Sequence, residues 1–188
     1  MTAIILAGGK SSRMGSDKAF IKIGGAFLIK RQMSLLKRVF KKIIIVTNHP
    51  RKYRFKDIQV VTDIIKNCGP LSGIHAGLKA SGAFYNFVVA CDMPFLNKRL
   101  IRHMIRQKNN YDVLVPEIDG RYHPLFGVYS KNCIPVIEDL LRQDKRKVSG
   151  IFPKVKSGFI SERQIQKFDK DLLSLANINT KQDLAKIK

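Results

Sequence analysis

Short, nearly unbroken apolar runs rich in isoleucine and valine recur along the 188-residue chain. They lie at residues 2–7, 43–47, 58–62, 86–91 and 112–116. Runs without the polar alternation of a half-exposed strand are typical of strands buried on both faces, as in a parallel sheet. Such a sheet needs helices on both sides, and this requirement restricts the fold more than any other feature of the sequence.

The stretches between these runs carry the period of an amphipathic helix. Residues 29–40 place apolar side chains at spacings of four, three and four, and residues 98–108 repeat the helical period. Residues 70–82 are small and contain glycine, which predicts a short helix packed close to the sheet. The alternation of strand and helix predicts an α/β protein with a doubly wound, mostly parallel, Rossmann-like sheet.

The pattern changes in the C-terminal third. Residues 121–129, RYHPLFGVY, are predicted to be extended and to form a small antiparallel addition to the sheet. A helix around 134–142 and a short strand near 164–168 are expected next, and the capping-box pattern from Thr180 to Asp183 predicts a last helix. No repeat or linker is visible, so residues 1–188 are expected to form a single domain.

The chain is strongly basic, with 35 lysine and arginine residues against 14 aspartate and glutamate residues and a formal charge of +21. This charge is compatible with nucleic acid, phosphorylated small molecules or anionic lipid as partners, and equally with solvated lysines on helix surfaces. No apolar run approaches the roughly 20 residues of a membrane span. The N-terminus also lacks a signal-peptide pattern, so a soluble, cytoplasmic protein is expected.

The cysteine and histidine residues give no sign of a metal cluster or of a disulfide framework. They are scattered along the chain and form no CxxC pair. They are Cys68, Cys91, Cys133, His49, His75, His103 and His123. A zinc site is therefore not expected.

A loop rich in glycine and cationic residues follows the first apolar run. Its sequence, LAGGKSSRMGSDKA, spans residues 6–19. Glycines let backbone N–H groups approach an anion closely, and Arg13 and Lys18 can neutralise phosphate oxygens. The GxGxxG spacing of dinucleotide folds and the GxxxxGK(S/T) spacing of P-loop proteins are both missing. The loop is predicted to hold phosphate in another way; the competing interpretation is an ordinary turn with exposed cations.

Polar residues also follow the later strands, where ligands of open α/β sheets bind. Asn48 and Asp63 come after the second and third runs. A lone asparagine at a strand end is more often a turn or cap residue, and Asp63 by itself is weak evidence for a site. Residues 69–73, a Gly-Pro turn with small neighbours, suit a flat ligand or close helix packing. Asp92 follows the most apolar run, where a carboxylate needs a cation or a hydrogen-bond partner. It would hold a divalent metal opposite a phosphate loop, or else cap the helix after Pro94.

Five sequence blocks together resemble the molybdenum cofactor guanylyltransferases, which are nucleotidyltransferases of glycosyltransferase-A type fold. The blocks are LAGGKSSRMGSDKA, GPLSGIHAGL, VVACDMPF, HPLFGVY and NINTKQDL, and they cover nearly the whole chain. The resemblance implies that GMP is transferred from GTP to the phosphate of molybdopterin, releasing pyrophosphate, with Mg²⁺ as the metal. It also implies a nucleotide-diphospho-sugar transferase type of sheet.

The resemblance assigns roles to single positions. Asp92 matches the magnesium ligand, and Lys18, with Arg13 beside it, is expected to neutralise the phosphates during catalysis. Asn177 and Asn179 are expected on the pterin side. The positions expected to contact nucleotide or substrate are Leu6, Ala7, Gly8, Gly9, Lys18, Asn48, Asp63, Gly69, Pro70, Leu71, Gly73, Asp92, Asn177 and Asn179.

Other functions stay open at the level of sequence. One is a nucleotidyltransferase of the same fold that uses CTP or a sugar phosphate. Another is a basic nucleic-acid-binding protein, against which stands the absence of aromatic residues interleaved with the basic clusters. A third is a nucleotide sensor without catalysis, which should lack Asp92 or Lys18. A protein that delivers the oxygen-sensitive molybdopterin is a further expected partner.

Overall fold

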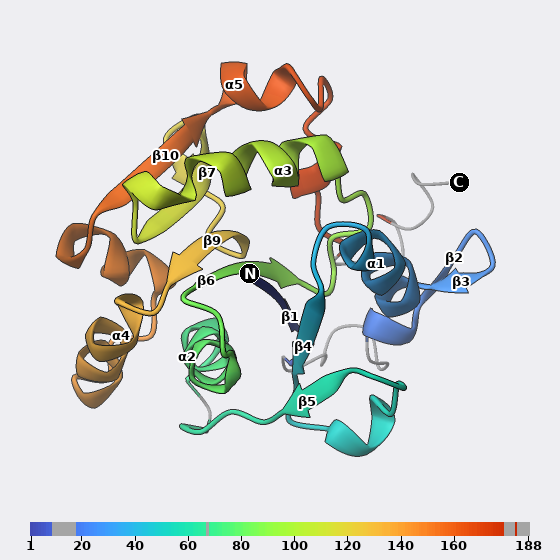
Figure 1. The fold of residues 1–188 in the computed structure, drawn as a ribbon, viewed down its shortest axis with the longest axis horizontal. Coiled ribbons are helices and arrows are strands. Elements are labelled where there is room, and N and C mark those ends of the chain that lie inside the picture. The colour runs from blue at the N-terminus through green and yellow to red at the C-terminus, as the bar shows by residue number, and fades with distance from the viewer. Residues whose placement is uncertain (9–17, 67, 179–182, 184–188) are drawn as a thin grey trace.

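The computed structural model describes residues 1–8, 18–66, 68–178 and 183. Within these residues an eight-stranded sheet forms the centre of the molecule (Figure 1). Its strands are β1 (Thr2–Leu6), β4 (Lys42–Val46), β5 (Gln59–Val61), β6 (Tyr85–Ala90), β7 (Val113–Ile118), β8 (Arg121–Tyr122), β9 (Phe126–Ser130) and β10 (Ser157–Ser161). The order across the sheet is β10-β7-β9-β6-β1-β4-β5, and β8 pairs with β7.

The central strands are parallel, as their unbroken apolar character predicts. β1 pairs in parallel with β4 and with β6, so that Leu6 lies opposite Val46 on one side and Ala90 on the other. β5 continues the parallel arrangement beyond β4. The predicted strands agree with the observed ones to within two residues at each end. The expectation of a doubly wound, mostly parallel sheet is confirmed.

Helices cover both faces of this sheet (Figure 1). They are α1 (Leu28–Lys37), α2 (Pro70–Ala80), α3 (Lys98–Gln107), α4 (Cys133–Arg142) and α5 (Glu162–Gln166). Successive residues of β1 point to opposite cores: Ala3 and Ile5 pack with α1 and α3, whereas Ile4 and Leu6 pack with α2 and α4. In the part of the chain that the structure describes, no helix is long and apolar enough to cross a membrane.

The antiparallel addition predicted from residues 121–129 is present. β9 runs antiparallel between β6 and β7. The prediction of a strand near 164–168 is wrong, because residues 164–166 belong to α5, a turn follows, and the strand, β10, lies earlier in the chain. Ser161 caps α5 in a capping box with Gln164, and this local signal ends the strand. Thr180, where the last helix was predicted to begin, lies outside the described residues.

A small hairpin that the sequence analysis did not predict precedes α1. Its strands, β2 (Lys22–Ile23) and β3 (Ala26–Phe27), form a separate two-stranded antiparallel sheet. Gly24 and Gly25 connect them with φ angles of +56° and +80°. Positive φ at both central positions is the requirement of a tight hairpin turn, which explains the Gly-Gly pair.

Candidate active site

The carboxyl ends of β1 and β6 meet at the switch point of the sheet. The chain passes outward from β1 to β4 and β5, and β6 then joins β1 on its other side. Ligands of open α/β sheets bind at such a point. The residues beyond these two strands are neighbours, because the Cys91 amide donates to the Leu6 carbonyl at 3.0 Å and the Ala7 amide donates to the Val46 carbonyl at 2.8 Å. The segments around Gly8 and Asp92 therefore lie at one edge.

Lys18 and Asp92 form an ion pair at this edge. Lys18 lies in η1, a 3-10 helix (Lys18–Phe20), and its Nζ is 3.3 Å from Asp92 Oδ2. The two side chains are 22% and 20% exposed, so ligands can still reach the pair. The other carboxylate oxygen, Asp92 Oδ1, is buried and has no hydrogen-bond partner among the described residues. One carboxylate oxygen of Asp92 therefore contacts a cationic side chain, and the other has no partner in the described parts of the chain.

The unpartnered oxygen fits a magnesium ion. Mg²⁺ prefers carboxylate oxygens and in phosphate-transfer sites takes one or two protein carboxylates, completed by water and substrate phosphates. In the described parts of the chain no group of three or more His, Cys, Asp or Glu side chains could hold a metal. A site with one carboxylate that relies on phosphate oxygens for its other ligands is consistent with both observations.

A second polar pair lies beyond β4 and β5. Asn48 Nδ2 donates a hydrogen bond of 2.9 Å to Asp63 Oδ2. Burial raises the pKa of the Asp63 carboxyl above its ordinary value, and the Asn48 hydrogen bond acts in the opposite direction. The structure thus joins Asn48 to Asp63 and Lys18 to Asp92.

The N-terminus of α2 lies close to this second pair. Gly69 precedes the helix with φ +67°, and Pro70 occupies its first turn. A Cβ atom on Gly73 would lie 3.2 Å from Leu6 Cδ2 and 3.7 Å from Asp63 Oδ1. Glycine at this position lets the helix approach the end of β1. The positive end of the helix dipole therefore lies near the Asp63 carboxylate.

Several predicted contact positions offer only backbone to a ligand. The side chains of Leu6, Ala7 and Leu71 are buried in the two cores, at 7%, 4% and 0% exposure. Gly8 packs against the segment that follows β4, since a Cβ there would be 3.8 Å from Thr47 Cα. Contacts from these positions would come from N–H and carbonyl groups, as in other anion-binding loops.

The C-terminal segment reaches the same edge. The Ile178 amide donates to the Asp92 carbonyl at 2.9 Å, and the Ile178 side chain is 1% exposed. The neighbouring Asn177 is exposed beside this contact. Three other predicted residues lie outside the described residues: Gly9, Arg13 and Asn179.

Two buried side chains that the sequence analysis missed contact the backbone of this site. Gln32, in the middle of α1, donates to the carbonyls of Ala90 and Met93 on either side of Asp92. Tyr53 Oη donates to the Ala7 carbonyl at 3.4 Å. The helical period of the sequence could have singled out Gln32, because it is the one polar residue on the buried face of α1. The buried residues of this helix are Leu28, Ile29, Gln32, Met33 and Leu36.

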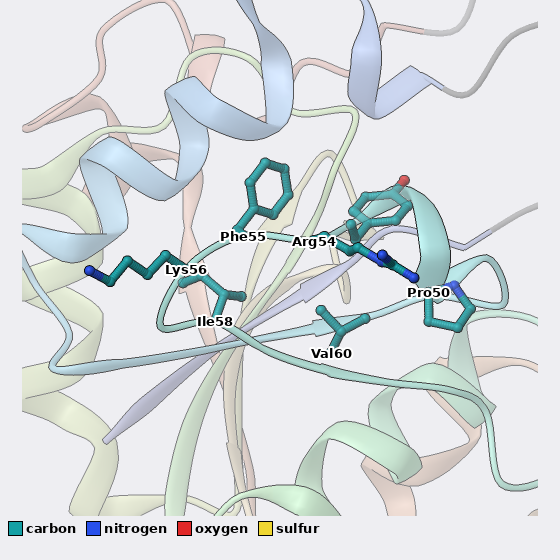
Figure 2. Close-up of a pocket in the computed structure, with 7 residues that line it drawn as sticks. Pro50, Arg54, Phe55, Lys56, Ile58 and Val60 are labelled. Carbon is teal, nitrogen blue, oxygen red and sulfur yellow. The ribbon is translucent and has the colours of Figure 1, made fainter.

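A pocket of about 450 Å³ lies next to the site but contains none of the predicted site residues. Figure 2 shows the side chains that surround it, from η2 (Pro50–Lys52), β5 and the segment between them. Tyr53 lines this pocket, and its hydroxyl group donates a hydrogen bond to the Ala7 carbonyl. The lining residues are Pro50, Tyr53, Arg54, Phe55, Lys56, Ile58 and Val60.

Comparisons with known proteins relate this geometry to a family. Residues 3–155 match the family model of the MobA-like NTP transferase domain. The chain is 41% identical over 187 residues to a probable molybdenum cofactor guanylyltransferase of Pelotomaculum thermopropionicum, covering 100% of this chain and 91% of the relative. It is 40% identical over 188 residues to the molybdenum cofactor guanylyltransferase of Desulfosudis oleivorans, covering 99% and 93%.

Solved structures show the same fold. The molybdopterin-guanine dinucleotide biosynthesis protein A of Archaeoglobus fulgidus is similar, with a TM-score of 0.87 and 27% identity, over 100% of this chain and 96% of that chain. A 4-diphosphocytidyl-2C-methyl-D-erythritol synthase of Anaerococcus prevotii shares the fold with a TM-score of 0.71 and 17% identity, over 99% and 93%. The chain belongs to the molybdenum cofactor guanylyltransferase family, within the MobA-like NTP transferases.

Proposed function

We propose that this protein transfers GMP from GTP to the phosphate of molybdopterin, releasing pyrophosphate and forming molybdopterin guanine dinucleotide. The observation that carries this proposal is the pairing of Lys18 with Asp92 at the switch point of the sheet, with one carboxylate oxygen unpartnered among the described residues. A cation beside an available carboxylate is the combination that a triphosphate with its metal requires. The relatives of about 40% identity are named for this reaction.

The reaction needs no nucleophilic side chain. An oxygen of the molybdopterin phosphate attacks the α-phosphorus of GTP in line, and a new oxygen–phosphorus bond forms. The bond from the α-phosphorus to the oxygen that bridges to the β-phosphorus breaks, and its electron pair leaves with pyrophosphate. The protein contributes positioning and charge neutralisation, which dominate catalysis of phosphoryl and nucleotidyl transfer.

Lys18, Arg13 and Asp92 divide the electrostatic work in this proposal. The Lys18 ammonium, with the Arg13 guanidinium, neutralises the phosphates and the departing pyrophosphate. Asp92 would hold Mg²⁺ through its available oxygen, and the bound ion would supply further neutralisation of phosphate charge. Because Lys18 contacts Asp92 Oδ2 in this structure, the phosphates of an incoming nucleotide compete with Asp92 for Lys18.

The remaining predicted residues are assigned in this proposal to the two ends of the substrate pair. Asn48, Asp63 and the backbone of residues 69–73 would contact the guanine base or ribose on the β4–β5 side. Asn177 and Asn179 would contact the pterin side, since Ile178 between them is bonded to Asp92. A protein that delivers the oxygen-sensitive molybdopterin belongs to the same proposal.

Nucleotide binding and pyrophosphate release test this function together. Calorimetric titration in Mg²⁺ should give tighter binding of GTP than of CTP, ATP or UTP. Pyrophosphate release should then require both GTP and molybdopterin. A preference for CTP would favour a cytidylyltransferase, and release from GTP without any acceptor would indicate a hydrolase.

A further inference from the structure

Gln32 joins the two carbonyl groups that flank the predicted metal ligand. Its side-chain Nε2 donates to the Ala90 carbonyl at 2.9 Å and to the Met93 carbonyl at 2.8 Å. Cys91 and Asp92 are the residues between these acceptors. Both hydrogens of one amide group thus close the turn that carries Asp92.

Each residue of this turn makes a hydrogen bond through its backbone. β6 ends at Ala90, and the Cys91 amide continues the contact with β1 through the Leu6 carbonyl at 3.0 Å. The Asp92 carbonyl accepts from the Ile178 amide at 2.9 Å. Gln32 supplies the bonds from α1, so the turn is anchored by a strand, a helix and the C-terminal segment. Buried carbonyl groups need such partners, because water cannot replace them.

Core packing alone does not explain a glutamine at this position. Gln32 is 1% exposed and lies among the apolar residues of α1. Its Oε1 is buried and has no hydrogen-bond partner among the described residues. An unsatisfied buried oxygen is unfavourable, and an apolar residue of similar size would avoid it. The two donated bonds are what the amide adds, and both go to the turn around Asp92.

We propose that Gln32 is a positioning residue that holds Asp92 in place opposite Lys18. It contacts no reacting atom; it fixes the backbone from which the carboxylate extends. This role rests on the proposed nucleotidyl transfer, in which Asp92 must meet the metal and the phosphates. A displacement of about 1 Å in such a site can lower the rate about a hundredfold.

The test compares two buried amides at opposite ends of β6. Gln32→Met keeps the length of the side chain and removes both donors. Asn86→Leu is the matched control, because Asn86 is 0% exposed and donates to the Ala83 and Phe84 carbonyls at 3.1 and 3.4 Å. We expect Gln32→Met to lower kcat about tenfold to a hundredfold, with an unchanged KM for GTP. Asn86→Leu should keep kcat even where it lowers the melting temperature equally.

Hydrogen exchange followed by NMR gives a readout that does not depend on activity. Gln32→Met should accelerate exchange of the Cys91 and Ile178 amides about tenfold relative to the amides of β6, whereas Asn86→Leu should not. If Gln32→Met does not fold, Gln32→Asn, with its shorter amide, is measured in the same way. Equal loss of kcat in both variants, or unchanged exchange at Cys91 and Ile178, overturns the positioning role. If the wild-type protein transfers no GMP, the proposed function fails, and hydrogen exchange still decides whether Gln32 holds the turn.

Discussion

At the scale of single residues, the ion pair between Lys18 and Asp92 is the central feature of the candidate site. Lys18 Nζ lies 3.3 Å from Asp92 Oδ2. Partly exposed ion pairs contribute little to stability, so we propose that this pair serves binding rather than stability. The following substitutions separate its binding role from its small structural one.

Replacing Lys18 with methionine should lower turnover and leave the fold intact. Loss of one charge-assisted contact costs roughly 1.5–3 kcal/mol, which corresponds to about a tenfold to hundredfold loss in kcat/KM. Steady-state kinetics and thermal denaturation check both parts. The same substitution at Lys37, an exposed lysine of α1, is the control. Wild-type kinetics for Lys18→Met would contradict the role of Lys18.

Replacing Asp92 with asparagine should abolish Mg²⁺-dependent transfer almost completely. The amide keeps the shape of the side chain and removes the negative charge, so the melting temperature should change little or rise. Asp63→Asn, measured in parallel, should keep the dependence on Mg²⁺. If Asp63→Asn loses that dependence while Asp92→Asn keeps it, the two carboxylates have been assigned the wrong roles.

The raised pKa of Asp63 predicts a pH-dependent contribution to stability. A carboxyl whose pKa is higher in the folded state binds its proton more tightly there than in the unfolded chain, where the ordinary value is 3.8. The free energy of unfolding therefore decreases as the pH rises through the interval from 3.8 to the raised folded value. Asp63→Asn removes this term, so its stability relative to wild type should be higher at pH 7 than at pH 4. Urea denaturation of both proteins at pH 4 and at pH 7 measures this difference in the free energy of unfolding. The same difference at the two pH values would contradict the prediction.

At the scale of elements, the close packing of α2 on β1 brings the helix N-terminus to the site. A Cβ on Gly77 would lie 2.5 Å from Ile4 Cγ2, so alanine there must displace the Ile4 side chain, the helix or the strand. We expect Gly77→Ala to destabilise the protein, because overpacking costs about 1–3 kcal/mol and the gain in helix propensity is only about 1 kcal/mol. Gly82→Ala is the control, since a Cβ there meets nothing within 4 Å. Urea denaturation showing equal stability of the two variants would contradict this packing.

The helices and strands also differ in how well sequence patterns predict them. The buried strands and the helices between them were predictable, because their apolar periods are long and follow directly from burial on two faces. The two-residue strands of the β2–β3 hairpin carry no period, and β10 was misplaced because the apolar residues around α5 resemble a short strand. For such short elements the turn and capping residues decide the structure.

The candidate site was predictable in part for a similar reason. The rule that ligands bind beyond the carboxyl ends of strands selects Asn48, Asp63 and Asp92 from the sequence alone. The sequence does not show which side chains pair, because pairing depends on the strand order. The fold brings Lys18 next to Asp92, which lies 74 positions later in the chain. Gln32 reaches the site from the middle of a helix, and no strand-end rule selects it.

At the scale of the whole molecule, the fold alone does not specify the nucleotide. The fold is shared with a 4-diphosphocytidyl-2C-methyl-D-erythritol synthase at 17% identity. The choice of base must therefore depend on side chains and backbone at the site. The charge of +21 is compatible with a reaction that brings two phosphate-bearing substrates together, because their mutual repulsion must be offset.

The most direct test is mass analysis of the product formed from molybdopterin, Mg²⁺ and each nucleoside triphosphate in turn. We predict molybdopterin guanine dinucleotide and pyrophosphate from GTP, with a far lower kcat/KM for CTP, because a site that hydrogen-bonds one base leaves its polar groups unpaired with another. The Asp92→Asn variant should form neither product. Equal formation of the cytosine dinucleotide, or no dinucleotide from any triphosphate, would contradict the account.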